Sequence, residues 1–127
     1  MSADLVWLLV RNNSSFIVKR DGANLTTEAG NLTNQNRRKY TGLASEKIVD
    51  VAGDKDGFVH LTVKNNNLRH RSLGATLLLK KDPRRVNKAI KANVAASRKD
   101  LVNEALYKAT RLKQTAGGVS KKTKKQK

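Results

Sequence analysis

The sequence lacks cysteine and holds few acidic, aromatic and proline residues among its 127 positions. Without cysteine the chain can form no disulfide framework and no thiolate zinc site, so we expect an intracellular protein. Its one long apolar run, residues 5–10, is too short to span a membrane and lacks the basic flank of a secretory signal. We therefore expect neither a membrane-spanning nor a secreted protein.

Positive charge is what the sequence has in excess. The chain carries 27 Lys and Arg against 10 Asp and Glu, for a formal net charge of +17. Residues 1–36 are net neutral, residues 37–82 carry +5 and residues 83–127 carry +12. Such a chain repels itself when compact and favours a polyanionic partner, which could be nucleic acid, an acidic membrane surface or an acidic protein. We take nucleic acid as the leading interpretation.

The N-terminal part has short segments of different periodicity. Residues 5–10 predict a short helix capped by Ser2, although a strand over the same residues is an alternative. Residues 15–20 are rich in β-branched and aromatic side chains, which predicts a strand, and Asp21-Gly22 predicts a turn after it. Residues 23–45 show no sustained period, so we expect a loop or an extended arm.

The middle of the chain predicts a small antiparallel sheet. Residues 47–51 and 58–64 read as strands, and the Gly-Asp-rich segment 53–57 reads as the hairpin connection between them. Residues 74–79 are a third apolar run, for which strand and helix are both open. How the strands pair in residues 46–80 does not follow from the sequence.

The C-terminal part is helical by pattern. Asp82 before Pro83 predicts a helix start with Asp82 as the cap, and Ser97 with Asp100 predicts a second start. Whether residues 83–113 form one helix or two stays open. The first segment has an apolar side, and the second has an apolar stripe that ends near Gly117-Gly118. The members of these stripes are Val86, Ile90, Val94, Leu101, Val102, Ala105, Leu106, Ala109 and Leu112.

These segments together predict an α+β fold. A short N-terminal helix and a small antiparallel sheet are followed by basic C-terminal helices and a lysine-rich tail. We divide the chain into a small α+β domain (residues 1–80), a basic helical extension (residues 81–116) and a disordered tail (residues 117–127).

Motifs for catalysis or cofactors are weak. His60 and His70 could act as acid and base in RNA cleavage, but nothing in their spacing supports this. Asp54 to Gly57 resembles a calcium loop, yet Ala52 and Val63 occupy two of the ligand positions. No phosphate-binding glycine motif is present. We therefore expect no enzyme, no metal site, no cofactor and no small-molecule substrate, and keep a small nuclease as an alternative.

Clusters of basic residues are the remaining candidates for a functional site. Arginine offers a planar fork of donors to phosphate oxygens, and lysine acts as a mobile point charge. With few aromatic residues available for stacking, we expect phosphate contacts rather than base reading, and Tyr40 is the best stacking candidate. The predicted RNA-binding residues are Arg37, Arg38, Lys39, Tyr40, Arg69, His70, Arg71, Lys80, Lys81, Arg84, Arg85, Lys88, Lys91, Arg98, Lys99, Arg111, Lys113, Lys121, Lys122, Lys124 and Lys125.

Several blocks in the first 47 residues keep a specific order and spacing: residues 5–7, 10–13, 15–20, 31–32 and 39–44, with Lys47 shortly after. This order resembles the eukaryotic ribosomal protein family numbered twenty-eight in the large subunit. Residues 98–101 and the alanines after them are similar to the last helix of that family, whereas residues 52–82 diverge. A nucleolar ribosome-assembly factor shares the N-terminal domain but is longer, with acidic stretches and cysteines.

The resemblance implies a non-catalytic constituent of the cytosolic large ribosomal subunit, assembled in the nucleolus. Its expected partners are large-subunit ribosomal RNA and neighbouring ribosomal proteins, with no membrane partner. Alternatives are a ribosome-assembly factor, a general RNA- or DNA-binding protein and a cationic membrane-active protein.

Overall fold

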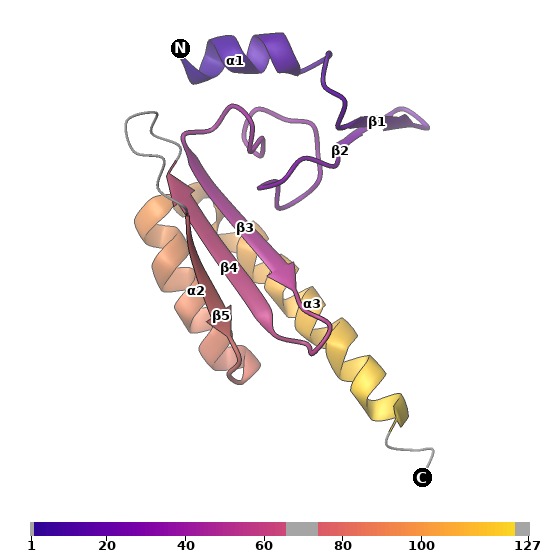
Figure 1. The fold of residues 1–127 in the computed structure, drawn as a ribbon, viewed down its shortest axis with the longest axis vertical. Coiled ribbons are helices and arrows are strands. Elements are labelled where there is room, and N and C mark those ends of the chain that lie inside the picture. Colours follow the sequence, from indigo (N-terminus) through magenta and orange to yellow (C-terminus); the bar gives the residue numbers. More distant parts are fainter. Residues whose placement is uncertain (1, 66–73, 124–127) are drawn as a thin grey trace.

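A computed structural model describes residues 2–65 and 74–123 of the chain, and the side chains of all these except Asn65 and residues 117–123. Figure 1 shows a short helix, a two-stranded hairpin, a three-stranded sheet and two long helices in that order. The α+β prediction is confirmed. The elements are α1 (Ala3–Val10), β1 (Ile17–Arg20), β2 (Ala23–Thr26), β3 (Lys47–Gly53), β4 (Val59–Asn65), β5 (Ala75–Leu79), α2 (Pro83–Ser97), the 3₁₀ turn η1 (Lys99–Leu101) and α3 (Val102–Thr123).

The first segment is the predicted helix and not a strand. The Ser2 hydroxyl accepts a hydrogen bond from the backbone N–H of Leu5 at 3.3 Å, which caps α1. Asp4 stands in the first turn, where a negative charge favours the helix dipole. The backbone N–H of Arg11 closes the last turn on the carbonyl of Trp7. No side chain of this helix is buried, although nearly all of them are apolar.

A hairpin follows, and here the sequence interpretation was partly wrong. Residues 23–45 were expected to be a loop or an extended arm, but Ala23–Thr26 form β2, which pairs antiparallel with β1. The reason is the turn between the strands. Asp21 has φ 45° and Gly22 has φ 78°, and positive φ at both central residues matches the right-handed twist of a tight hairpin.

The three-stranded sheet has the order β3-β4-β5, with antiparallel pairing throughout. Both predicted strands and their hairpin are present, and the third apolar run is a strand rather than a helix. Leu61 of β4 is opposite Val51 of β3 on one side and Leu77 of β5 on the other. The hairpin closes with a hydrogen bond from the backbone N–H of Asp54 to the carbonyl of Phe58 at 2.9 Å.

The C-terminal segment forms two helices, and three details differ from expectation. Asp82 occupies the N-cap of α2, but its side chain makes no capping hydrogen bond. Ser97 ends α2 instead of starting the next helix, because the backbone leaves the helical region at Arg98 (φ −140°, ψ 91°). Helix α3 runs past Gly117 and Gly118 to Thr123, since glycine lowers helix stability without forbidding the conformation.

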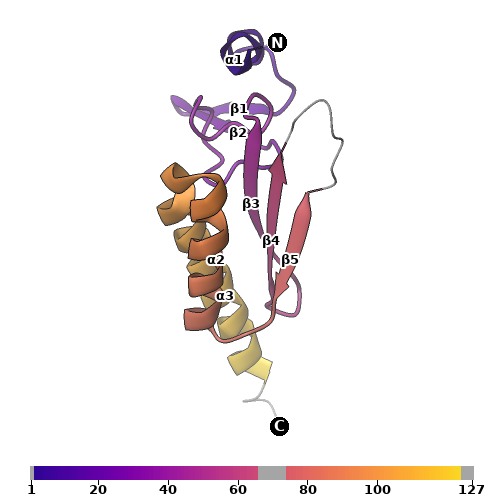
Figure 2. The ribbon, with the colours of Figure 1, turned by 90° about the vertical axis from the view of Figure 1, so that its left-hand side faces the viewer.

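Both long helices cover the same face of the three-stranded sheet, as Figure 2 shows from the side. The apolar stripes predicted for the two helices meet the inward side chains of β3 and β4 in one core. Each fully buried aliphatic side chain there contributes roughly 1.5–3 kcal/mol. The core consists of Leu32, Val49, Val51, Val59, Leu61, Val86, Ile90, Val94, Leu101, Ala105 and Ala109. The division of the chain into a domain (residues 1–80), a helical extension (residues 81–116) and a tail (residues 117–127) stays a prediction. The sheet and the two helices, which this division separates, share the one core.

Candidate nucleic-acid interface

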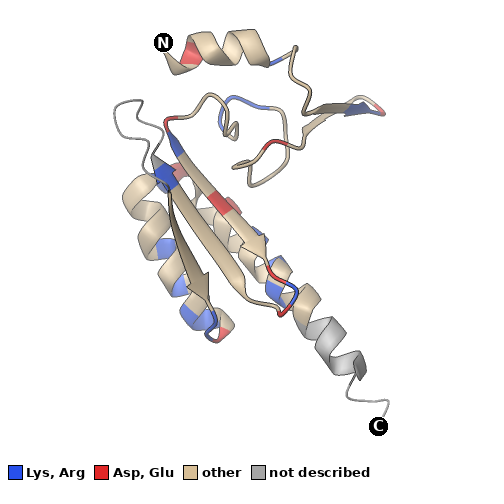
Figure 3. Ribbon diagram, viewed as in Figure 1, with Lys and Arg blue, Asp and Glu red and all other residues tan. Residues whose placement is uncertain are grey.

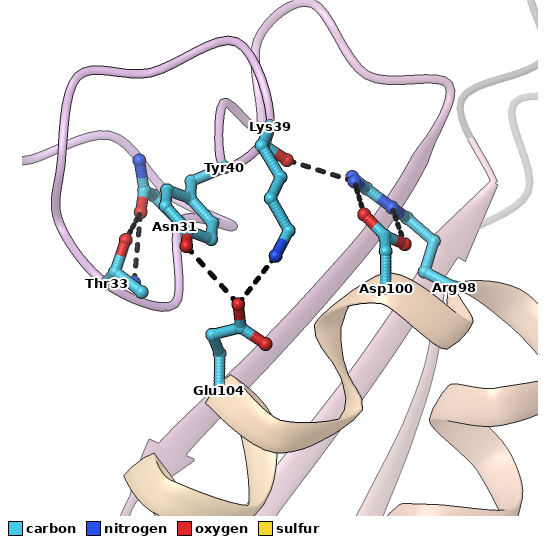
Figure 4. Close-up of polar contacts among 7 residues, drawn as sticks. All are labelled: Asn31, Thr33, Lys39, Tyr40, Arg98, Asp100 and Glu104. Atoms are coloured by element: carbon cyan, nitrogen blue, oxygen red, sulfur yellow. Dashed lines mark hydrogen bonds and ion pairs between the residues drawn. The ribbon is translucent and has the colours of Figure 1, made fainter.

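The loop before β3 is fastened to α3 by one carboxylate. Lys39 Nζ donates to Glu104 Oε1 at 2.7 Å, and the Tyr40 hydroxyl donates to the same oxygen at 3.3 Å. Figure 4 shows both side chains pointing down onto Glu104 from the loop. The Tyr40 ring also packs against the hydrophobic core. Two residues predicted to bind RNA therefore hold the loop on the helix.

This contact changes the titration of both charged partners. The hydrogen bond with Glu104 raises the pKa of Lys39 above its ordinary value. Partial burial alone would raise the pKa of Glu104, but the hydrogen bond from Lys39, a backbone hydrogen bond, the positive charge of Lys39 and the hydrogen bond from Tyr40 together outweigh it and leave that pKa lowered. Both groups are thus held in their charged forms over a wider pH range than in the unfolded chain.

Arg98, at the junction between α2 and η1, is a second fastening point. Its guanidinium donates twice to the Asp100 carboxylate, from Nη2 at 2.6 Å and from Nε at 3.2 Å. Nη2 also donates to the carbonyl of Lys39 at 3.0 Å (Figure 4). Nη1 donates to the hydroxyl of Ser45 at 3.4 Å. The hydrogen bond from Arg98 lowers the pKa of Asp100. The planar fork of Arg98 is therefore occupied inside the protein.

Arg38 is also paired, whereas Arg37 is not. Arg38 Nε donates to Asp4 Oδ1 of α1 at 2.9 Å, which links the loop to the N-terminal helix. Within the described part of the chain, Arg37 is exposed and its side chain forms no ion pair. Of the first predicted cluster, Arg37 alone presents its charge to solvent in this way.

A buried carboxylate shapes the loop, and the sequence analysis did not find it. Glu28 accepts hydrogen bonds from Asn31 Nδ2 at 3.0 Å, from the Thr41 hydroxyl at 3.2 Å and from the backbone N–H of Gly42 at 3.3 Å. Asn31 in turn accepts a hydrogen bond from the backbone N–H of Thr33 at 3.1 Å. In the sequence, the only sign of this buried carboxylate is that several Asn and Thr residues lie near a single glutamate.

A group of exposed basic residues lies on α2 and on the segment that leads into it. In Figure 3 the ribbon is blue, the colour of Lys and Arg, at several places along this helix and at its connection to β5. All members are exposed, and none forms an ion pair with a carboxylate among residues 2–65 and 74–116. We name it the α2 basic surface; its residues are Lys80, Lys81, Arg84, Arg85, Lys88 and Lys91.

Cations lie over two further aromatic rings, those of Phe58 and Tyr107. Lys80 Nζ lies 5.4 Å from the centre of the Phe58 ring, and Lys113 Nζ lies 5.9 Å from it. On α3, Arg111 donates to the Tyr107 hydroxyl at 3.0 Å and 3.1 Å. Tyr107 is 63% exposed. Its outward position follows from the inward positions of Ala105 and Ala109, one helical turn apart.

The other predicted residues divide by position. Lys99 is exposed in η1. Lys121 and Lys122 are in the last turns of α3, but their side chains are not described. Arg69, His70, Arg71, Lys124 and Lys125 lie outside the described residues. Lys108, which the prediction omitted, pairs with Asp50 of β3 at 3.1 Å.

The described residues offer little to catalysis. His60 Nε2 lies 3.6 Å from Asp54 Oδ2, and no second histidine is in the described part of the chain. No three His, Asp or Glu side chains in this part gather into a group that could hold a metal ion. Its helices are all too short or too polar to cross a membrane.

Comparison with known proteins gives one consistent result. A sequence model described as the ribosomal L28e protein family matches residues 5–115. Three curated relatives are each named large ribosomal subunit protein eL28. The one from Dictyostelium discoideum is 46% identical over 52 residues, 41% of this chain and 39% of the relative. The one from Caenorhabditis elegans is 38% identical over 85 residues, 65% and 67% of the two chains. The one from Trypanosoma cruzi is 28% identical over 116 residues, 90% and 77%.

Proposed function

Because the chain belongs to the ribosomal L28e protein family, we propose that it is a structural constituent of the large subunit of the cytosolic ribosome. In this role it binds ribosomal RNA and performs no catalysis. The relatives named as large-subunit proteins support the proposal, and the match over residues 5–115 is the observation that carries it.

The α2 basic surface is the proposed RNA contact. Its exposed cations can each lie beside a phosphate, and the release of condensed counterions then drives binding with little dependence on base sequence. The absence of carboxylate partners in the described structure supports this, because no internal ion pair has to break first. Arg37, Lys99, Arg111 and Lys113 would extend the contact on either side.

Lys39, Tyr40 and Arg98 have a different role in this proposal. They fix the loop before β3 on α3 through Glu104 and Asp100, so their contribution to RNA binding is to hold the fold. Residues 69–71 and the lysines from Lys121 onward remain in the proposed interface on the basis of their charge alone.

Helix α1 is the proposed contact with a neighbouring ribosomal protein. Leu5, Leu8 and Leu9 are 47%, 59% and 60% exposed, although an apolar helix is normally buried. The first 36 residues are net neutral, so this end of the molecule has little attraction for phosphate. An apolar groove on an adjacent protein would cover these leucines.

Sedimentation through a sucrose gradient tests the proposal. A tagged copy expressed in a eukaryotic cell should migrate with mature large subunits and polysomes, with nucleolar staining during assembly. Confinement to pre-ribosomal fractions would instead assign the protein to ribosome assembly. Migration only at the top of the gradient would contradict both functions. The matched variant R85Q/K88Q should shift part of the protein to the top, since it keeps the core and removes two cations of the α2 basic surface.

A further inference from the structure

Tyr107, in the first half of α3, exposes its aromatic ring to solvent. Its exposed fraction of 63% is the largest among the large apolar and aromatic side chains that the structure describes. Ala105 and Ala109 lie on the opposite side of the helix, where they are fully buried in the core. The packing of the fold therefore does not account for an aromatic residue at position 107.

Arg111, one turn further along α3, holds this ring. Its Nη2 and Nε atoms donate to the Tyr107 hydroxyl at 3.0 Å and 3.1 Å. The guanidinium carbon is 5.3 Å from the ring centre, which is longer than the roughly 3.5–4.0 Å between atoms in stacked contact. Arg111 thus restricts the ring at its hydroxyl end and leaves most of its surface accessible.

The residues beside the ring are polar or positively charged. Asn103 and Arg111 lie one turn before and one turn after Tyr107, and all three share one exposed side of α3 because residues four apart in a helix are neighbours. Glu104 is the only acidic residue after position 100, and its carboxylate accepts from the loop before β3. An anionic ligand at Tyr107 would therefore meet a cation, and the carboxylate of α3 is already paired.

An aromatic ring, an amide and a guanidinium in one row match the three parts of a nucleotide. The ring offers a stacking surface to a base, and the amide of Asn103 can hydrogen-bond a base edge or a ribose 2′-hydroxyl. Nη1 of Arg111 takes no part in the contact with the Tyr107 hydroxyl, so its donors can serve a phosphate oxygen.

A protein partner matches this face less well. Leu106 and Leu112 pack against the core, and the exposed residues on the outer side of α3 near Tyr107 include Thr110 and Gln114. Protein interfaces surround an aromatic hot spot with other contacts that exclude water, and their centres are depleted in charge. Here a single ring stands among polar side chains, which favours a nucleotide.

We propose that Tyr107 and Arg111 form a stacking site for one unpaired RNA base, with Asn103 at the base edge or ribose and Arg111 at an adjacent phosphate. Bases inside a duplex have their faces covered, so the site selects a bulged or looped-out nucleotide. The proposal rests on the proposed RNA binding, and adds a preference that phosphate contacts alone do not provide. It gives Tyr107 the stacking role expected of Tyr40, whose ring packs against the core.

Two short RNA duplexes of the same sequence test this site, one fully paired and one with a single bulged 2-aminopurine. In fluorescence anisotropy the full-length chain should bind the bulged duplex more tightly. Y107L keeps an apolar side chain without the ring, and it should weaken binding of the bulged duplex about fivefold or more with no effect on the paired one. The 2-aminopurine fluorescence should be lower in the complex with the parent protein than in the complex with Y107L.

Two further variants separate stacking from folding. Y107F retains the ring and should retain the preference for the bulged duplex. F16L removes another exposed ring, outside α3, and should change neither affinity. The thermal transition of Y107L should equal that of the parent protein, since the ring is exposed.

Arg111 is tested separately. R111Q should weaken binding of both duplexes and lower the slope of log affinity against log salt concentration by about 0.7–0.9, the contribution of one phosphate contact. An unchanged slope would overturn the role given to Arg111.

Other outcomes would overturn the site as a whole. Equal affinity of the parent protein for the two duplexes would do so, as would an equal loss for both in Y107L, and neither result would affect the proposed RNA binding. No salt-dependent binding to either duplex would contradict that function as well. If Y107L kept both affinities but no longer migrated with large subunits, the ring would contact a protein and the proposal would be wrong.

Discussion

Lys39 donates a hydrogen bond to Glu104 at 2.7 Å, across 65 positions of sequence. The contact joins the loop before β3 to the first turn of α3, and Tyr40 adds a second donor to the same oxygen. Two of the residues predicted to bind RNA, Lys39 and Tyr40, thus also hold the loop on α3. Its consequences can be measured on stability rather than on affinity.

Replacing Glu104 by glutamine should lower the free energy of unfolding by about 1 kcal/mol, because Lys39 loses an ionised partner. Because folding lowers the pKa of Glu104, the ionised carboxylate stabilises the folded state in a pH-dependent way. The stabilisation is fully present above the ordinary pKa of 4.5 and is lost as the pH falls through the lower folded-state pKa. Urea unfolding at neutral and acidic pH should show the difference between the two proteins shrinking in acid. E46Q is the control, because Glu46 is exposed and forms no ion pair with the side chains that the structure describes. A difference that persisted below that range would contradict this assignment.

Arg98→Lys should destabilise the protein by about 1–2 kcal/mol, although charge is conserved. Lysine cannot reach Asp100 with two donors and also serve the carbonyl of Lys39. Thermal unfolding followed by circular dichroism measures the effect. Lys99→Arg, at the next and exposed position, should leave the midpoint unchanged. Equal midpoints for R98K and the parent protein would show that the fork adds nothing.

Arg85→Gln with Lys88→Gln should reduce RNA affinity and flatten its dependence on salt. Each phosphate contact contributes about 0.7–0.9 to the slope of log affinity against log salt concentration. Lys39→Gln removes the same kind of charge at a paired position and should leave both quantities nearly unchanged. Titrations of a ribosomal RNA fragment between 50 and 200 mM salt compare the parent protein, R85Q/K88Q and K39Q. Over this range the affinity falls by roughly a thousandfold when six or more phosphates are bound. A larger loss for K39Q than for the double variant would reverse the assignment.

Gly42→Ala should cost about 3 kcal/mol or prevent folding. A Cβ at position 42 would collide with the carbonyl oxygen of Ala29 and press on the backbone of Gly30. Backbone atoms cannot move aside as a flexible side chain can. Gly22→Ala is the matched comparison: its φ is 78°, but no atom lies within 4 Å of the added Cβ. That variant should cost only about 1 kcal/mol. Similar midpoints for the two variants would contradict the steric argument.

Removal of residues 121–127 deletes five lysines and should weaken RNA binding and lower its salt slope. The residues that form the core all precede this segment, so the thermal transition should be unchanged. Loss of that transition would show that the end of the chain is needed for folding.

Local patterns predicted the elements that carry their own signal. Ser2 before an apolar run gave α1, Pro83 gave the start of α2, and the spacing of Val86, Ile90 and Val94 gave the buried side of that helix. In each case the residues that decide the structure are neighbours within one or two turns, so propensity and periodicity are sufficient.

Features that depend on distant partners were missed. β2 has only four residues, and it exists because Asp21 and Gly22 turn it back onto β1. The basic residues of the site posed the same difficulty. Lys39 and Lys88 look alike in sequence and both are exposed, but Lys39 pairs with Glu104, whereas Lys88 has no carboxylate partner among the described residues. Charge clusters locate candidate contacts, but tertiary ion pairs decide which of them remain available.

Order of synthesis gives the shared core a further consequence. Val49, Val51, Val59 and Leu61 lie on the face of the sheet that α2 and α3 cover, and both helices follow the sheet in the chain. A ribosome releases the N-terminal part first, so this face stays uncovered until residues 83–109 have left the exit tunnel. The nascent sheet must therefore be shielded by a chaperone or remain unfolded until that point. A transcript truncated within α3 would yield an aggregation-prone product rather than a shorter functional one.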